Sequence, residues 1–163
     1  MFHVVLVEPE IPPNTGNIIR LCANSGAQLH LIEPLGFPLD DAKMRRAGLD
    51  YHEFASMKVH KNWNDFLETM SPDPSRMFAF TTRGSSIFST LEFKPGDMFI
   101  FGSETKGLSP DIHAFFQEGH RVRLPMRPDN RSLNLSNSVA VGVYEVLRQW
   151  NYPELSGCGR LRD

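Results

Sequence analysis

Three short polar segments contain the residue types most suited to binding a ligand or taking part in a reaction. They are NTGNIIR (14–20), FGSETKGL (101–108) and LPMRPDNRSLNLSN (124–137). Each lies where a strand is expected to end or a helix to begin, and the first backbone N–H groups of a helix are free to bind an anion or another polar ligand. These segments are therefore the first candidates for a functional site.

The first segment opens a helix that we predict over residues 14–25. Asn14 can cap this helix through its side-chain oxygen. Arg20 follows on the second turn, where its guanidinium could hold an anionic group. A helix cap explains Asn14 without any ligand, so this segment alone does not define a site.

The second segment directly follows an apolar strand. Gly102 and Gly107 permit unusual backbone angles and close ligand approach, and Glu104 adds a carboxylate suited to a cationic ligand or a hydroxyl group. Lys followed by Ser or Thr does not come after Gly107, and G-x-G-x-x-G is missing, so this is neither a P-loop nor a dinucleotide fingerprint. An ordinary turn between a strand and a helix remains the alternative.

The third segment runs into the longest predicted helix and is unusually rich in small polar side chains. One or two of them would serve as caps, but five exceed what capping requires. A buried polar group without a partner costs about 1–3 kcal/mol, so we expect a bound ligand or a second subunit to supply partners. The five residues are Asn130, Ser132, Asn134, Ser136 and Asn137.

The predicted elements alternate along the chain. Apolar or β-branched runs predict strands, and apolar residues at helical spacing predict helices. This alternation predicts an α/β fold with a mostly parallel sheet flanked by helices, in which ligands bind beyond the carboxyl ends of the strands. The loops after Val7, Thr81, Phe101 and Leu124 are therefore expected to line the site. Strands are predicted at 2–7, 28–32, 55–59, 77–81, 97–101 and 121–124, and helices at 14–25, 40–46, 63–70, 110–116 and 134–150.

Composition indicates an ordinary globular protein. The chain has 163 residues, of which 40% are hydrophobic and 22% charged, and no apolar run reaches the roughly 20 residues needed to span a membrane. The N-terminus reads as a strand and not as a signal peptide, and Cys22 and Cys158 suggest neither a disulfide framework nor a zinc site. A cytoplasmic protein is expected.

The net charge of −2 argues against sequence-blind nucleic-acid binding, which usually needs a basic domain. Two basic clusters could still form local patches, although each could equally be solvated surface charge. The first consists of Lys43, Arg45 and Arg46, and the second of Arg121, Arg123, Arg127 and Arg131.

Taken together and in order, NTGNIIR, FGSETKGL and RSLNLSNSVAVGVYE resemble the three signature motifs of the SPOUT methyltransferases. EPEIPPNTGNIIRLCAN, RAGLDYHEF and SLNLSNSVAV are similar to the branch that methylates the ribose 2′-hydroxyl of tRNA at position 34, and the match covers residues 3–152. The resemblance implies one domain over residues 1–152 followed by a tail over 153–163. It also implies a SPOUT fold with a C-terminal trefoil knot over roughly 77–150.

The resemblance further implies S-adenosylmethionine (SAM) as the cofactor, no metal, and a homodimer whose sites draw on both chains. The expected substrate is the anticodon stem-loop of tRNA, and leucine tRNAs are expected. The methylated nucleotide would be the wobble nucleotide at position 34, which is C or a modified U. The residues implied for cofactor binding are Phe80, Thr81, Gly102, Glu104, Gly107, Val122, Leu124, Ser132, Leu133 and Asn134. Those implied for catalysis are Arg20, Glu104, Ser136 and Asn137, and those implied for RNA binding are Arg20, Arg45, Arg46, Arg131 and Tyr144.

A guanidinium rarely gives up its proton, so we expect Arg20 to hold a phosphate and stabilise a developing alkoxide and not to act as a base. For Tyr144, a place in the core is the alternative. Ser103 and Lys106 stand where the position-34 branch often has Pro and Arg. Methylation of another tRNA position or of ribosomal RNA therefore remains an alternative, as does a non-catalytic RNA-binding factor.

Overall fold

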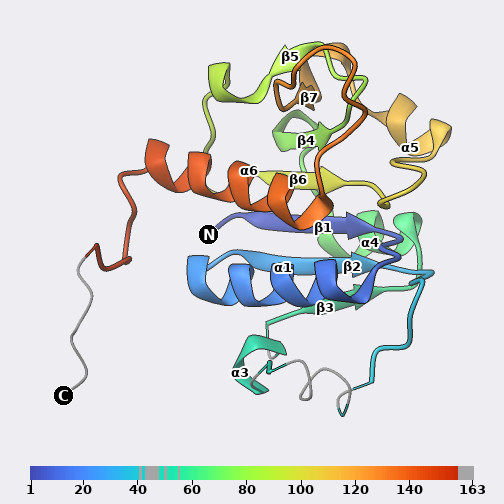
Figure 1. Ribbon diagram of the computed structural model, residues 1–163, viewed down its shortest axis with the longest axis vertical. Coiled ribbons are helices and arrows are strands. Elements are labelled where there is room, and N and C mark those ends of the chain that lie inside the picture. The colour runs from blue at the N-terminus through green and yellow to red at the C-terminus, as the bar shows by residue number, and fades with distance from the viewer. Residues whose placement is uncertain (41, 43–47, 50, 55, 158–163) are drawn as a thin grey trace.

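The computed structural model describes residues 1–40, 42, 48–49, 51–54 and 56–157 (Figure 1). Five helices and seven strands make up this part of the chain. The strands are β1 (His3–Val7), β2 (Gln28–Ile32), β3 (Lys58–His60), β4 (Met77–Phe80), β5 (Ser86–Ile87), β6 (Met98–Phe101) and β7 (Arg121–Arg123). The helices are α1 (Pro12–Ser25), α3 (Tyr51–Phe54), α4 (Trp63–Met70), α5 (Pro110–Phe115) and α6 (Leu135–Gln149), with short 3₁₀ turns η1 (Pro74–Arg76), η2 (Phe88–Thr90) and η3 (Glu118–His120).

The seven strands form one sheet in the order β3-β2-β1-β6-β4-β7-β5. Every pairing between neighbouring strands is parallel. The carboxyl ends of the strands therefore meet at one edge, and the loops that follow them lie close together. The predicted parallel α/β fold is confirmed.

Helices cover both faces of the sheet, and β1 shows how the sequence divides between them. Val4 and Leu6 pack in the core beneath α1 and α6, whereas Val5 and Val7 pack on the other face, beside α4 and α5. Successive side chains of a strand point to opposite faces, so a continuous apolar run is what a doubly covered strand requires. In Figure 1, α1 and α6 lie side by side across one face.

The predicted strand at 28–32 and the predicted helix at 63–70 match β2 and α4, and most other boundaries agree within two residues. The start of α1 was predicted wrongly. The helix begins at Pro12 with Ile11 at the cap position, so Asn14 lies inside the first turn and does not cap it. Pro is well suited to the first helical turn because its missing N–H would be unpaired there in any case.

Two other predicted elements need comment. The strand expected at 55–59 is β3, which starts at Lys58 because a turn closed by a hydrogen bond from the Met57 N–H to the Phe54 carbonyl precedes it. The two-residue strand β5 was missed, since so short a run carries no pattern. The helix predicted at 40–46 falls mainly outside the described residues.

Cys22 is buried in the core on α1, as predicted, and burial raises the pKa of its thiol to about 12. Among the described residues, no helix is long and apolar enough to cross a membrane. The same part of the chain contains no group of three or more His, Cys, Asp or Glu side chains that could hold a metal ion. The trefoil knot implied by the resemblance stays a prediction.

Candidate functional site

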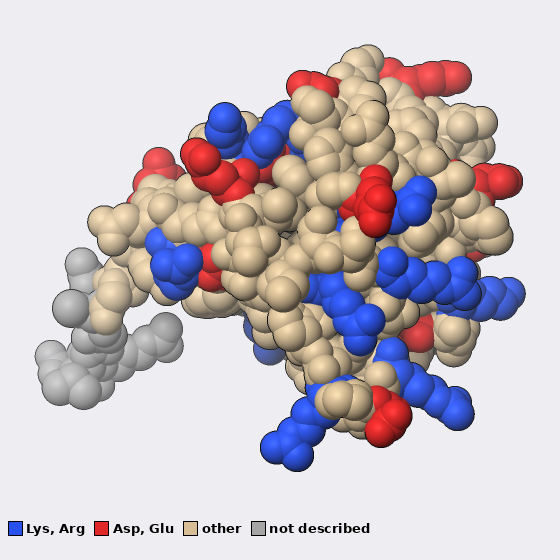
Figure 2. Space-filling view, turned by 90° about the horizontal axis from the view of Figure 1, so that it is seen from above, with Lys and Arg blue, Asp and Glu red and all other residues tan. Residues whose placement is uncertain are grey.

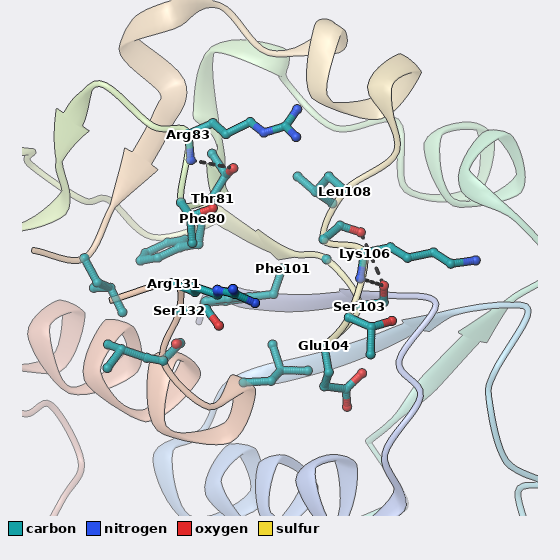
Figure 3. A pocket seen from close by; sticks show the side chains of 18 of the residues that line it. Phe80, Thr81, Arg83, Phe101, Ser103, Glu104, Lys106, Leu108, Arg131 and Ser132 are labelled. Atoms are coloured by element: carbon teal, nitrogen blue, oxygen red, sulfur yellow. Dashed lines mark hydrogen bonds between the residues drawn. The ribbon is translucent and has the colours of Figure 1, made fainter. Parts of the chain in front are cut away.

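A pocket of about 770 Å³ opens at the carboxyl ends of β4, β6 and β7 (Figure 3). Its wall comes from the turn after β4, the loop after β6, the segment after β7 and the segment leading into α6. It is completed by the first turn of α1, through Ile11 and Asn14. The pocket therefore lies where the parallel sheet predicts a ligand site.

Most of the residues implied for cofactor binding line this pocket. Val122 is the exception, because it is fully buried in the core beneath the pocket and its carbonyl accepts a hydrogen bond from the Thr81 N–H at 2.9 Å. The residues that do line it are Phe80, Thr81, Gly102, Glu104, Gly107, Leu124, Ser132, Leu133 and Asn134.

Aromatic rings form one side of the pocket. Phe80 stacks on Phe101 with ring centroids 4.6 Å apart and an angle of 22° between the ring planes. Gly142 of α6 lies against Phe80, and a Cβ at that position would come within 3.3 Å of the ring. The backbone of α6 therefore supports a flat apolar wall suited to a flat apolar group.

The loop after β6 closes on itself. Ser103 and Gly107 exchange two backbone hydrogen bonds of 3.3 and 3.0 Å, and Gly107 has a φ of 67°. A Cβ on Gly102 would lie 2.2 Å from the carbonyl carbon of Gly107. Both glycines are therefore required by the tight course of the loop, as their placement in FGSETKGL predicted.

Glu104 joins this loop to the start of α1. Its Oε2 accepts a hydrogen bond of 2.7 Å from the Glu10 N–H, and its Oε1 accepts one of 3.0 Å from the Ile11 N–H and one of 3.2 Å from Asn14 Nδ2. A carboxylate is also favoured by the positive end of a helix dipole. Glu104 thus lies in the pocket wall as predicted, but both of its oxygens are already engaged.

Asn14 extends this connection to the third polar segment. Its Oδ1 accepts a hydrogen bond of 3.0 Å from Asn134 Nδ2, so Glu104, Asn14 and Asn134 form a continuous chain. The three segments that stood out in the sequence therefore meet through their side chains at one rim of the pocket.

The surplus of small polar residues before α6 is partly explained by bonds within the chain. Asn134 caps α6, and its Oδ1 accepts hydrogen bonds from Ser136 Oγ at 2.7 Å and from the Asn137 N–H at 3.2 Å. Ser136 and Asn137 lie on the first turn of α6 and are not part of the pocket wall. The structure thus brings them near the rim, but not into contact with the cavity of their own chain.

Arg20 lies outside the pocket wall. Its Nε is 3.3 Å from Glu53 Oε1, its Nη2 donates a hydrogen bond to the carbonyl of Gly48, and half of its side chain is exposed. Arg20 therefore does not line the pocket of its own chain, and its implied catalytic role stays a prediction.

The remaining residues implied for RNA binding fall in three places. Arg131 lines the pocket. Tyr144 is exposed on α6, beside the exposed Val141, so the alternative of a core tyrosine is wrong. Arg45 and Arg46 lie outside the described residues.

Several cationic or titratable residues of the pocket were not among the implied site residues, although Arg123 belongs to the second basic cluster of the sequence. Arg83, Arg123, Lys106 and His113 all line it. Arg83 and His113 stand alone in segments without a motif, so the sequence carried no signal for them. Figure 2 shows Lys and Arg side chains gathered in the right half of that view of the molecule.

Comparison with known proteins identifies the family of this chain. The model of the SpoU rRNA Methylase family matches residues 1–144, so the chain belongs to this family. A protein from Burkholderia pseudomallei (strain 1106a) named tRNA (cytidine(34)-2'-O)-methyltransferase is 70% identical over 149 residues, which are 91% of this chain and 96% of that protein.

Solved structures agree with this family. A structure described as giving structural insights into the 2-OH methylation of C/U34 on tRNA has a TM-score of 0.83 and 41% identity, covering 93% of this chain and 97% of that chain. At the level of fold alone, the SpoU methyltransferase AviRb from Streptomyces viridochromogenes, solved with the cofactor AdoMet, has a TM-score of 0.75 at 23% identity. That match covers 91% of this chain and 57% of the other.

Proposed function

We propose that this protein uses SAM to methylate the ribose 2′-hydroxyl of nucleotide 34 in tRNA. The observation that carries the proposal is the hydrogen-bonded chain of Glu104, Asn14 and Asn134, which unites the three polar segments at one pocket. The relative named tRNA (cytidine(34)-2'-O)-methyltransferase supports the position, because it is similar over almost its whole length.

The residues of the pocket fit SAM. A volume of about 770 Å³ lies within the roughly 300–1,000 Å³ typical of small-molecule sites. The stacked Phe80 and Phe101 offer a flat wall to the adenine, with Leu124 and Leu133 beside it. The backbone of the loop 102–107 and of Ser132 and Asn134 offers hydrogen-bonding groups. When bound, the cofactor supplies a methyl group on a sulfonium, which is already activated for transfer.

The task left to the protein is to position the 2′-oxygen and stabilise the charge that develops on it. Orientation alone can contribute much of such a rate enhancement. A guanidinium rarely gives up its proton, so the role proposed for Arg20 is to hold the neighbouring phosphate and to stabilise the developing alkoxide. Ser136 and Asn137 complete the site beside the 2′-hydroxyl, and Glu104 holds the cofactor loop and α1 together.

Because Arg20 lies outside the pocket of its own chain, the proposal requires a homodimer in which it reaches the pocket of the partner subunit. The exposed Val141 and Tyr144 on α6 belong to the face that would form this dimer or contact RNA. Arg45, Arg46 and Arg131 are proposed to hold phosphates of the anticodon stem-loop. Residues 1–152 form the methyltransferase domain, residues 153–163 the tail, and the protein works in the cytoplasm.

The test combines purified protein, isotope-labelled SAM and unmodified tRNA, followed by mass-spectrometric mapping of the methylated nucleoside. A 2′-O-methyl group at position 34 is expected. A methyl group at any other tRNA position would overturn the assignment of the substrate, and failure of the protein to bind SAM in calorimetry would overturn the assignment as a methyltransferase.

Methylation of ribosomal RNA is the second candidate, because the matching family is described by that substrate and Ser103 replaces the Pro expected in the position-34 branch. The same labelled reaction with ribosomal RNA separates the two. Label incorporated into ribosomal RNA at a rate above that for tRNA would favour this candidate.

A further inference from the structure

Two long cationic side chains stand at the mouth of the pocket on separate loops. Arg83 belongs to the turn after β4 and Lys106 to the loop after β6, and both residues line the pocket and are exposed. In the view of Figure 3, their side chains extend toward the same side, with Leu108 between them. They therefore lie where a substrate that enters the pocket from solvent would meet them.

The backbone of Arg83 is fixed by the sheet. The Arg83 N–H donates to Thr81 Oγ1 at 3.2 Å, and the Gly84 N–H donates to the Thr81 carbonyl at 3.1 Å. A Cβ on Gly84 would lie 2.7 Å from the carbonyl carbon of Val122, so the turn packs directly on β7. The exposed side chain of Arg83 thus extends from a rigid base.

The loop after β6 holds Lys106 in a comparable way. The Lys106 N–H donates to Ser103 Oγ at 3.3 Å, and the Gly107 N–H beside it donates to the Ser103 carbonyl at 3.0 Å. Glu104, in the same loop, accepts three hydrogen bonds from the start of α1 and the segment before it. A long side chain on a rigid base binds a partner with a smaller loss of freedom than one on a loop that must first be ordered.

The protein itself does not neutralise these two cations. In the described part of the chain, no carboxylate lies within ion-pair distance of Arg83 or Lys106, whereas Arg20, Arg76 and Arg148 each pair with one. Positive charges that are left without a partner at the mouth of a pocket raise the local concentration of an anionic substrate. The two side chains are therefore suited to a polyanion.

The cofactor does not account for these charges. SAM carries a sulfonium and an ammonium against one carboxylate, so its net charge is positive and poorly matched to further cations at the mouth. RNA carries a negative charge on each phosphate, and contacts from Arg and Lys to phosphates fix the position of the strand. The exposed Arg131, which also lines the pocket, is already proposed to hold such a phosphate.

We propose that Arg83 and Lys106 hold backbone phosphates of the RNA strand at the mouth of the pocket and thereby position the ribose that is methylated. The inference rests on the proposed function and adds two positioning residues to it. The guanidinium of Arg83 can donate two parallel hydrogen bonds to one phosphate, whereas the ammonium of Lys106 acts as a point charge. The substrate strand is then held by the same subunit whose loops line the cofactor pocket.

The salt dependence of tRNA binding tests this proposal without turnover. Each phosphate contact releases counterions and contributes about 0.7 to the slope of log Kd against log salt concentration for a single-stranded segment. Arg83→Gln and Lys106→Gln are each expected to lower this slope by about 0.7 and to weaken tRNA binding about fivefold at roughly 0.1 M salt. The loss should shrink as the salt concentration rises. Arg83→Lys and Lys106→Arg keep the charge and should keep the slope.

Two controls separate a phosphate contact from other causes. S-adenosylhomocysteine, which remains of SAM after methyl transfer, should bind both Gln variants within about twofold of the unaltered protein in calorimetry, since neither side chain is proposed to contact the cofactor. Lys94→Gln is the matched control for charge. Lys94 is exposed on the loop before β6, at the opposite edge of the parallel sheet, so its loss removes the same charge away from the pocket.

Unchanged slopes in both Gln variants, or an equal change in Lys94→Gln, would overturn the proposal. A comparable loss of S-adenosylhomocysteine binding would also overturn it, because the two cations would then serve the cofactor. If the unaltered protein bound no tRNA, the proposed function itself would fail together with this inference.

Discussion

Arg20 on α1 and Glu53 on α3 form an ion pair, with Nε 3.3 Å from Oε1, and the guanidinium also donates to the carbonyl of Gly48. Two acceptors on one segment fix the direction in which the guanidinium points. The segment around α3, which resembles the RAGLDYHEF motif of the position-34 branch, thereby acquires a physical role: it positions Arg20.

Replacing Arg20 should therefore affect turnover more than cofactor binding. Arg20→Ala is expected to lower kcat by about 10²-fold, the size seen when a group that stabilises a developing oxyanion is lost. The Kd for S-adenosylhomocysteine should stay within about twofold, since the proposed contacts of Arg20 are with the RNA phosphate and the developing alkoxide and not with the cofactor. Single-turnover kinetics and calorimetry measure the two quantities, and a comparable loss in both would contradict this role.

Glu53→Gln tests positioning separately. The amide keeps one acceptor oxygen but loses the charge, so we expect a fall in kcat of about tenfold, smaller than that for Arg20→Ala. Glu53→Asp, which restores the charge on a shorter side chain, should recover part of the loss. A variant that loses stability without any change in kcat would mean that the pair is purely structural.

Glu104→Gln should loosen the junction between the cofactor loop and α1. The amide would direct an N–H₂ group at backbone N–H donors that now share the carboxylate, and the expected loss is about 1–3 kcal/mol in the free energy of unfolding. Denaturant unfolding measures it. Glu10→Gln is the matched control, because the Glu10 carboxylate is engaged by the exposed Thr105 hydroxyl and its loss should cost far less.

Gly102→Ala is expected to abolish the pocket. The new Cβ would lie 2.2 Å from the carbonyl carbon of Gly107 and 2.3 Å from the nitrogen of Leu108, so the loop must move. Overpacking of this kind costs about 1–3 kcal/mol, and SAM binding should be lost in calorimetry. Gly119→Ala, where a Cβ would meet nothing within 4 Å, should leave both stability and SAM binding unchanged.

Three histidines form a row across β1, β2 and β3, on the face of the sheet that α4 covers. His3 Nδ1 lies 3.0 Å from His30 Nε2, and His30 Nδ1 lies 3.0 Å from His60 Nε2, with the ring of Phe66 against His30 and His60. Burial, together with the neighbouring histidines and Lys58, lowers the pKa of His30 from 6.5 to about 3. Burial also lowers the pKa values of His3 and His60.

This row makes stability depend on pH. The unfolded chain binds a proton at His30 near pH 6.5, whereas the folded chain does so only near pH 3. The free energy of unfolding is therefore highest above pH 6.5 and falls between pH 6.5 and 3, by up to about 1.4 kcal/mol per pH unit for one proton. His30→Gln should flatten this dependence in urea titrations at pH 7.5 and pH 5. Identical slopes for His30→Gln and the unaltered protein would contradict this account.

Most of the fold could be predicted from local patterns, because β1, β2, β4 and β6 are apolar runs long enough to be recognised as strands buried on both faces. The pocket could be placed at the strand ends for the same reason. Contacts between residues distant in the chain could not be predicted. Glu104 reaches the start of α1 across more than 90 residues, and this bond depends on the strand order, which local pattern does not contain.

The histidine row illustrates the same limit. His3, His30 and His60 are separated by 27 and 30 residues and belong to no motif. Only the register of β1, β2 and β3 brings them together. Arg83 and His113 likewise come to line one cavity only because the turn after β4 and α5 border it.

The strand order also has a consequence for how the chain is made. β1 pairs with β2 as soon as the first half of the chain is available, but its other neighbour is β6, which lies more than 90 residues later in the sequence. During synthesis, the apolar edge of β1 therefore stays open until Met98–Phe101 emerges from the ribosome, an interval on the order of seconds. An open strand edge can pair with another chain, so newly made molecules pass through a period in which they are most prone to aggregation and most dependent on chaperones.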